Sequence, residues 1–190
     1  YRDQVYAHVE LSIPGMHNVK NVLAASAAAA VLGVPGWAVE QGMRDFRLPG
    51  RRFEYKGDYN GAEVCDDYAH HPGELEVLLD SAKSLGHKRV ICAFQPHTYT
   101  RTHELFDDFV RVLKKPDITL LAEIYAARET NDLGISSADL AAQIPGSIFC
   151  PTLEDVTAKL RELAQPGDLI LTVGAGDIYR AGEMLVATEK

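Results

Sequence analysis

The sequence is poor in cysteine, with three in 190 residues, and the three lie far apart. No two of them have CxxC spacing, so the sequence indicates neither a disulfide framework nor a thiolate metal site. Cys65, Cys92 and Cys150 each have the neighbours typical of a strand. We therefore expect three reduced core cysteines in a cytoplasmic protein.

The sequence also lacks a long apolar run and an excess of basic residues. No uncharged apolar run reaches the ~20 residues that a membrane-spanning helix needs, and the N-terminus does not resemble a signal peptide. Lys and Arg number 19 against 27 Asp and Glu, a net charge of −8. Because phosphate backbones and anionic membranes attract a basic face, we expect neither nucleic acid nor a membrane as a partner.

The first 48 residues differ in pattern from the rest. The chain opens without Met on a strand-like segment, Val5–Leu11, which suggests a piece of something longer. The alanine-rich stretch 18–32 predicts a helix closed by glycine and proline. A second short helix is expected at 37–44, before Pro49. These signals predict a domain boundary at about residue 48.

From residue 49 onward, apolar strands alternate with amphipathic helices. Asn60-Gly61 supplies the positive φ angles of a hairpin turn. Apolar strands separated by amphipathic helices predict a mainly parallel sheet covered on both faces, so the fold class is α/β with a Rossmann-like domain over 49–190. The predicted strands are 52–59, 62–66, 90–94, 118–124 and 169–173, and helical stripes span 75–85, 105–113, 153–163 and the residues from about 178.

Polar residues follow the predicted strands, at the edge where parallel sheets bind ligands. Arg101 opens a helix, where a cation opposes the helix dipole, so it suggests either an anionic ligand or a solvated side chain. Asp66 and Asp67 either belong to a site or merely end a strand and cap the following helix. His70 and His71 point to opposite sides of an extended chain, so we do not expect histidine to ligate a metal.

Two phosphate-binding motifs are incomplete or missing. Gly174-Ala175-Gly176 follows a predicted strand but lacks the third glycine and the later acidic residue of a dinucleotide fingerprint. A tight turn with Asp177 as a helix cap explains it. The P-loop pattern GxxxxGK[ST] does not occur. From spacing alone, the sequence predicts an α/β domain with an Arg- and His-bearing ligand edge.

Four segments, taken together and in order, resemble the Mur ligase family. The family relative that recycles murein tripeptide shares the third segment but lacks the fourth, so the resemblance favours the alanine-adding branch, with the recycling ligase as the alternative. The segments are Pro14–Asn21 (PGMHNVKN), Gly50–Glu54 (GRRFE), Asp66–Pro72 (DDYAHHP) and Gln95–Thr102 (QPHTYTRT).

The resemblance implies a domain assignment and a reaction. Residues 1–48 would be the end of a central ATP-binding domain and 49–190 the complete C-terminal domain, while the UDP-sugar domain and the P-loop lie outside the chain. The reaction would join L-alanine to UDP-N-acetylmuramate through an acyl phosphate, with ATP and Mg²⁺ as cofactors and Mg²⁺ held mostly by the missing central domain. The fragment alone would be inactive. A stand-alone nucleotide-binding module and a metal-dependent hydrolase remain as rivals.

The resemblance also assigns residues to ATP. His17 and Asn18 would lie near adenine, and Asn18 and Asn21 match the family's paired asparagines. Arg52 would reach the phosphates as a catalytic cation. Asp67 would accept hydrogen bonds from the ribose hydroxyls.

For alanine, the resemblance points to four side chains, Tyr68, His70, His97 and Arg101. Arg101 would hold the carboxylate bidentately, beside an aromatic and imidazole wall. His97 and Arg101 also count as catalytic candidates. Arg128 stands where relatives carry glycine, and no role is assigned to it.

Overall fold

The computed structural model describes residues 1–11, 15–47 and 49–187, which form two compact units divided between Pro49 and Gly50. The predicted boundary residue, 48, and Pro14 of the first motif lie outside the described residues. The assignment of the first unit to an ATP-binding domain stays a prediction.

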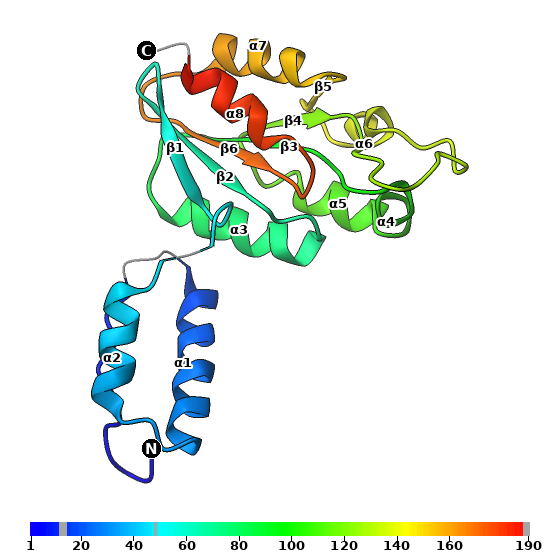
Figure 1. Ribbon diagram of the computed structural model, residues 1–190. Helices are drawn as coiled ribbons and strands as arrows, with labels where there is room; N and C mark the ends of the chain where they lie inside the picture. Colours follow the sequence, from blue (N-terminus) through cyan, green and yellow to red (C-terminus); the bar gives the residue numbers. More distant parts are fainter. Residues whose placement is uncertain (12–14, 48, 188–190) are drawn as a thin grey trace. The chain divides into compact units, whose positions relative to one another are not determined.

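The first unit contains two helices, α1 (Met16–Val31) and α2 (Gly36–Asp45) (Figure 1). Both helices were predicted, and the alanine content of α1 accounts for it. The predicted strand at Val5–Leu11 is wrong. A strand needs a neighbouring strand for its N–H and C=O groups, and the described part of this unit has none. The segment bonds to α2 and its preceding loop instead, through Tyr6 Oη to Val34 O (2.6 Å) and His8 N to Glu40 Oε1 (2.8 Å).

The second unit is built on a six-stranded sheet with the order β1-β2-β6-β3-β4-β5. Only β1 is antiparallel to its neighbour, so the predicted mainly parallel α/β fold is confirmed. The strands are β1 (Glu54–Tyr59), β2 (Ala62–Asp67), β3 (Val90–Phe94), β4 (Ile118–Ala122), β5 (Ile148–Cys150) and β6 (Leu169–Val173). The helices are α3 (Pro72–Ser84), α4 (Tyr99–Glu104), α5 (Phe106–Val112), α6 (Ser137–Gln143), α7 (Leu153–Leu163) and α8 (Tyr179–Val186).

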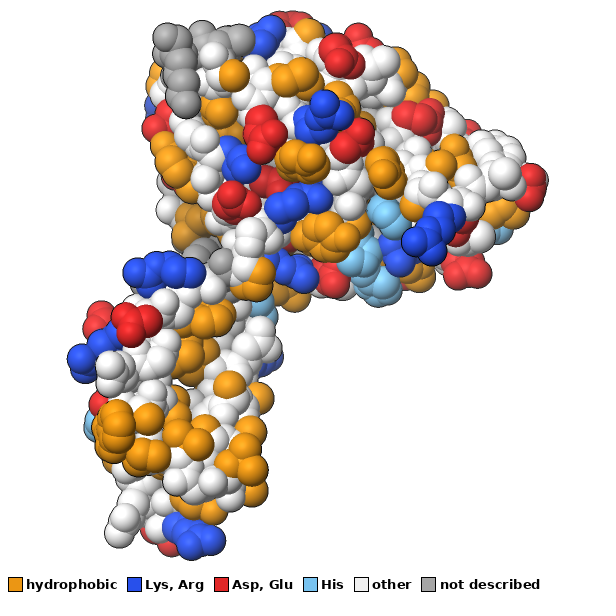
Figure 2. All heavy atoms as spheres, in the orientation of Figure 1, with side chains coloured by type: hydrophobic (Ala, Val, Ile, Leu, Met, Phe, Trp, Pro, Cys, Tyr) orange, Lys and Arg blue, Asp and Glu red, His pale blue; other side chains and the backbone are white. Residues whose placement is uncertain are grey.

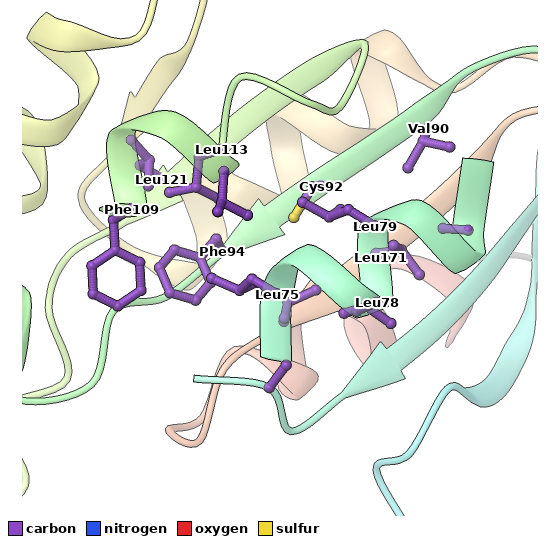
Figure 3. Close-up of a cluster of buried hydrophobic side chains, with 14 of the residues drawn as sticks. Leu75, Leu78, Leu79, Val90, Cys92, Phe94, Phe109, Leu113, Leu121 and Leu171 are labelled. Carbon is purple, nitrogen blue, oxygen red and sulfur yellow. The ribbon is translucent and has the colours of Figure 1, made fainter. Parts of the chain in front are cut away.

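Helices cover both faces of this sheet, with α3 and α5 on one face and α7 and α8 on the other (Figure 1). Because side chains alternate along a strand, β3 sends Cys92 and Phe94 to one face and Ile91 to the other. Figure 3 shows Phe94 against Phe109 of α5 and near Leu75 of α3. The apolar strands are therefore buried on both sides, as the sequence pattern predicts.

The three cysteines are free and buried on strands, as predicted. Burial raises the pKa of Cys92 to about 12 and also raises that of Cys150. A thiol with a raised pKa is a poor nucleophile and metal ligand. These side chains therefore act as small core residues. Among the described residues, no helix is long and apolar enough to cross a membrane.

Two local expectations need correction, whereas the predicted stripe at 105–113 matches α5 and its two capping residues, with α4 as a separate short helix before it. Asp177 does not cap α8, whose first turn follows Ile178; its carboxylate accepts a hydrogen bond from Gln95 Nε2 (3.0 Å). His71, and not Asp66 or Asp67, caps α3 by accepting from Gly73 N (3.1 Å).

Sequence reasoning missed α6, a helix of seven residues too short for a clear apolar stripe. Its signal was the capping box of Ser136 and Asp139. The hairpin turn is confirmed, since Asn60 and Gly61 both have positive φ angles (49° and 72°).

The buried face of α3 yields a stability prediction. Leu79 is fully buried, whereas Leu85, at the end of the same helix, is 43% exposed. Leu79→Ala should lower the free energy of unfolding by about 2–5 kcal/mol because it leaves a cavity, and Leu85→Ala should change it by less than ~1 kcal/mol. Urea unfolding followed by circular dichroism measures both. Equal losses would contradict this packing.

Candidate functional site

The segments that follow β2, β3, β4 and β6 meet at one edge of the sheet. The end of β2 contacts the loop after β6 through Gly174 N to Asp67 O (3.0 Å). The segment after β3 contacts the loop after β4 through Thr98 N to Tyr125 O (2.9 Å). Figure 2 shows histidine side chains gathered beside basic ones on the larger unit. The topology therefore brings polar segments together at the predicted edge.

Four rings form a row along this edge. The Tyr68 and His70 centroids are 5.6 Å apart, and those of His70 and His97 are 6.2 Å apart. His97 then stacks on Tyr125 at 5.6 Å with an interplanar angle of 20°. Tyr68 and Tyr125 are 38% and 39% exposed, so the row is open to solvent. The structure thus joins three of the predicted alanine-binding residues and adds Tyr125.

Arg101 lies beside this row, in the first turn of α4. Its Nη1 is 3.3 Å from His97 O and 3.5 Å from His97 Nδ1. It forms no ion pair with any residue that the structure describes, so its positive charge stays available to an anion. Burial, and then the nearby Arg101 charge, lower the pKa of His97. His97 is therefore neutral at physiological pH.

Arg51 was not predicted as a functional residue, yet it organises the edge. Its Nε pairs with Asp66 Oδ2 at 2.7 Å, and the Asp66 side chain is fully buried. Its Nη1 and Nη2 donate to the carbonyls of Gly176 (3.0 Å) and Gly174 (2.6 Å). The guanidinium also lies over the rings of Tyr68 and Tyr179, at 5.0 and 4.7 Å.

One signal pointed to such a partner in the sequence. Asp66 ends an apolar strand, and a buried carboxylate requires a cation or several donors. Asp66 has both, because Thr172 Oγ1 donates to its Oδ1 at 2.8 Å. Arg51 and Arg52 of the second motif and Lys56 were the cations to consider.

Arg52, the predicted phosphate-binding cation, is arranged differently from Arg51. Its guanidinium makes no hydrogen bond and no ion pair within the described ranges, and its carbon is 5.9 Å from the centre of the Tyr68 ring. The side chain is exposed. Arg51 is therefore committed to the fold, while Arg52 presents an unused charge to solvent.

Asp67 already serves the fold. Its Oδ2 accepts from Phe53 N and its Oδ1 from Ala69 N, both at 2.8 Å. Burial raises its pKa, while these two bonds and Arg52 oppose the rise. A carboxylate has about four acceptor positions, so two remain for a ligand. Ribose binding by Asp67 stays a prediction.

The glycines after β6 are required for packing. A Cβ at Gly176 would lie 2.3 Å from Gln95 Oε1 and 2.7 Å from Tyr125 Cγ. A Cβ at Gly174, where φ is 148°, would lie 2.6 Å from Gln95 O. Close approach between loops therefore explains this Gly-Ala-Gly turn without a dinucleotide.

His17, Asn18 and Asn21 lie on α1 of the first unit, with Asn18 buried and the other two exposed. Their predicted position near adenine stays a prediction. In the parts of the chain that the structure describes, no three His, Cys, Asp or Glu side chains are grouped as metal ligands.

Comparison with known proteins places this geometry in a family. A UDP-N-acetylmuramate–L-alanine ligase from Lachnospira eligens is 47% identical over 182 residues, which are 94% of this chain and 40% of that protein. The crystal structure of the UDP-N-acetylmuramate–alanine ligase MurC from Thermotoga maritima is 27% identical, with a TM-score of 0.79 over 98% of this chain and 41% of that one. A murein peptide ligase from Psychrobacter arcticus is 28% identical, with a TM-score of 0.68 over 98% of this chain and 40% of that one.

The chain thus spans about two fifths of the length of these relatives. The family model for the Mur ligase, glutamate ligase domain, matches residues 51–176, which is more than half of the chain and includes the whole cluster around His97. On this match and the identities above, the chain belongs to the Mur ligase family.

Proposed function

We propose that this chain is the C-terminal part of an ATP-dependent ligase that joins L-alanine to UDP-N-acetylmuramate in peptidoglycan biosynthesis. The observation that carries the proposal is the grouping of Tyr68, His70, His97 and the unpaired Arg101 at one sheet edge, in a chain whose relatives are alanine ligases. The first unit would be the end of the central ATP-binding domain. The UDP-sugar domain and the P-loop would lie in the rest of the longer protein.

Arg101 suits the carboxylate of alanine. A guanidinium holds a carboxylate by two parallel hydrogen bonds, which orients the amine without contacting it. Neutral His97 adds no second positive charge that would repel an ammonium group. The rings of Tyr68 and His70 would then line the space for the methyl group, where each extra methylene changes binding by only about 1–3 kcal/mol.

ATP would be bound by Arg52, Asp67 and three residues of α1. ATP, when bound, supplies the phosphoryl group that activates the lactyl carboxylate. The exposed charge of Arg52 would meet the negative charge that spreads over the phosphoryl oxygens. Asp67 would accept from the ribose, and His17, Asn18 and Asn21 would lie by adenine, whose N6 and N7 match an Asn amide. Among the described residues, no three His, Cys, Asp or Glu side chains are grouped, and Mg²⁺ would be held mostly by the rest of the longer protein.

Murein tripeptide ligation is the second candidate, favoured by the likeness to the murein peptide ligase. The higher TM-score with the alanine ligase and the names of the curated relatives, at 41–47% identity, support alanine instead. Assaying the longer protein with L-alanine and with the murein tripeptide separates the two. Faster ligation of the tripeptide would favour the recycling reaction.

Arg101→Ala in the longer protein should raise KM for alanine about 10- to 150-fold, since a hydrogen bond to a charged group contributes about 1.5–3 kcal/mol. KM for ATP should change less than about threefold. Steady-state kinetics with each substrate varied in turn measures both. Arg111→Ala is the matched control, because Arg111 pairs with Glu76 on the surface. Equal changes in both KM values would refute the carboxylate role.

Asp67→Asn in the longer protein should weaken ATP binding about three- to tenfold, because it replaces one charged acceptor by an amide donor. Calorimetric titration with ATP measures the affinity, and a thermal melt reports the structural effect separately. A lower melting temperature with unchanged ATP affinity would leave Asp67 only its bonds to Phe53 and Ala69.

The chain alone should bind ATP weakly and ligate nothing, because it contains no P-loop pattern. Titration calorimetry on the purified chain tests this expectation. A Kd of about 1 μM or below would favour a stand-alone nucleotide-binding module. One tightly held zinc per chain would favour a hydrolase.

A further inference from the structure

The turn between His97 and Arg101 has an unfavourable backbone conformation. Thr98 has φ 71° and ψ 144°, a combination that β-branched residues rarely adopt. Thr98 is also the residue before α4, and its side chain makes no capping bond to the helix. Something outside the turn must therefore hold it and satisfy the first N–H groups of α4.

Glu129, from the loop after β4, supplies that support. Its Oε2 accepts a hydrogen bond from Thr100 N at 2.9 Å, and its Oε1 accepts from the Thr100 hydroxyl. These two bonds, the hydroxyl first, lower the pKa of Glu129, so it is charged at neutral pH. A negative charge at the start of a helix is favourable. Glu129 thus caps α4 from a different loop.

The same loop holds the other end of the turn. Tyr125 O accepts from Thr98 N at 2.9 Å, and the Tyr125 ring stacks on His97. The loop itself is tight, with Glu129 N donating to Ala126 O at 3.0 Å. The segment 125–129 therefore bonds both to the residue before α4 and to the first turn of that helix.

The bonds between Glu129 and Thr100 lie on the surface. Thr100 is exposed and Glu129 is half-buried. Changing them empties no part of the core, so variants should fold. A change in substrate binding in such a variant would then result from a displaced side chain at the site and not from loss of the sheet.

We propose that Glu129 is a positioning residue for the amino-acid substrate: through Thr100 it fixes the start of α4 and so sets Arg101 against His97. The inference rests on the proposed function. Glu129 acts through Thr100 and does not itself contact the substrate.

The charged groups that face His97 allow a measurement on the chain itself, without the longer protein. Arg101 and His70 lower the pKa of His97, and Glu129 raises it. Removing the Glu129 charge should therefore move the His97 titration to still lower pH. This charge effect acts whether or not the turn is held, so faster exchange of the Thr100 N–H is the readout that reports positioning.

The first experiment uses the 190-residue chain. NMR titration follows the His97 ring protons, and amide exchange follows Thr100 N–H, in Glu129→Gln. Glu162→Gln is the matched control, because Glu162 pairs with Lys159 on α7. We expect a lower His97 pKa and roughly tenfold faster Thr100 exchange only in Glu129→Gln. An unchanged Thr100 exchange rate in Glu129→Gln would overturn the proposal, whatever the His97 pKa does.

The second experiment uses the longer protein. Glu129→Gln and Thr100→Val should each raise KM for alanine roughly tenfold, with KM for ATP changed less than about twofold and Thr100→Ser near the parent value. Adding Thr98→Gly to Glu129→Gln should recover most of the loss, because glycine adopts this backbone conformation freely.

Equal rises in both KM values, or no rise, would overturn the positioning role. If the parent protein ligates no alanine, the proposed function fails, and the Thr100 amide exchange of the chain still decides whether Glu129 holds the turn.

Discussion

The buried ion pair between Arg51 and Asp66 is the interaction on which the site edge depends. A carboxylate with no solvent contact inside a sheet must be paired, and removing one partner of such a pair costs about 3–5 kcal/mol. The guanidinium that meets this need also binds two carbonyls after β6 and lies over two tyrosine rings. The guanidinium that neutralises Asp66 therefore also joins the ends of β2 and β6.

Arg52 and Asp67 follow the two residues of this pair in the sequence but have different partners. Successive side chains of an extended chain point to opposite sides. Asp66 faces Arg51 and Thr172, whereas Asp67 faces the backbone N–H groups of Phe53 and Ala69. Arg51 is fully used, and Arg52 beside it keeps its charge for solvent or a ligand. Arg51 and Asp66 thus hold the fold, whereas exposed Arg52 keeps its charge and Asp67, although bonded to two N–H groups, keeps acceptor positions for a ligand.

The sequence predicted the elements whose signal is local. β3 and β6 match their predicted bounds because they are short apolar runs, broken only by Thr172 in β6, and α1 was found to within two residues because of its alanine content. Val5–Leu11 has the local pattern of a strand, but strand formation depends on a partner that local pattern does not reveal. α6 is too short for a periodic signal.

The candidate site shows the same difference between features with a local sequence signal and features that depend on distant partners. Motif resemblance was enough to pick out Tyr68, His70, His97 and Arg101, which the structure brings together. Arg51, Tyr125 and Glu129 were not assigned roles, because their partners lie far along the chain; Arg51 to Gly174 is one such contact. The strand order, which brings these segments together, was beyond what periodicity can specify.

The place of β6 in the sheet has a consequence for how the domain forms. β6 comes last among the described strands in the chain, yet it lies between β2 and β3 in the sheet. During synthesis, β2 and β3 emerge long before the strand that joins them, and such distant pairings slow folding. A nascent chain that stops before residue 169 would contain every ring of the row, but Tyr68 and His70 after β2 would lack the strand that sets them beside His97. The substrate edge is thus assembled only when the final strand inserts, so incomplete polypeptides have no finished site.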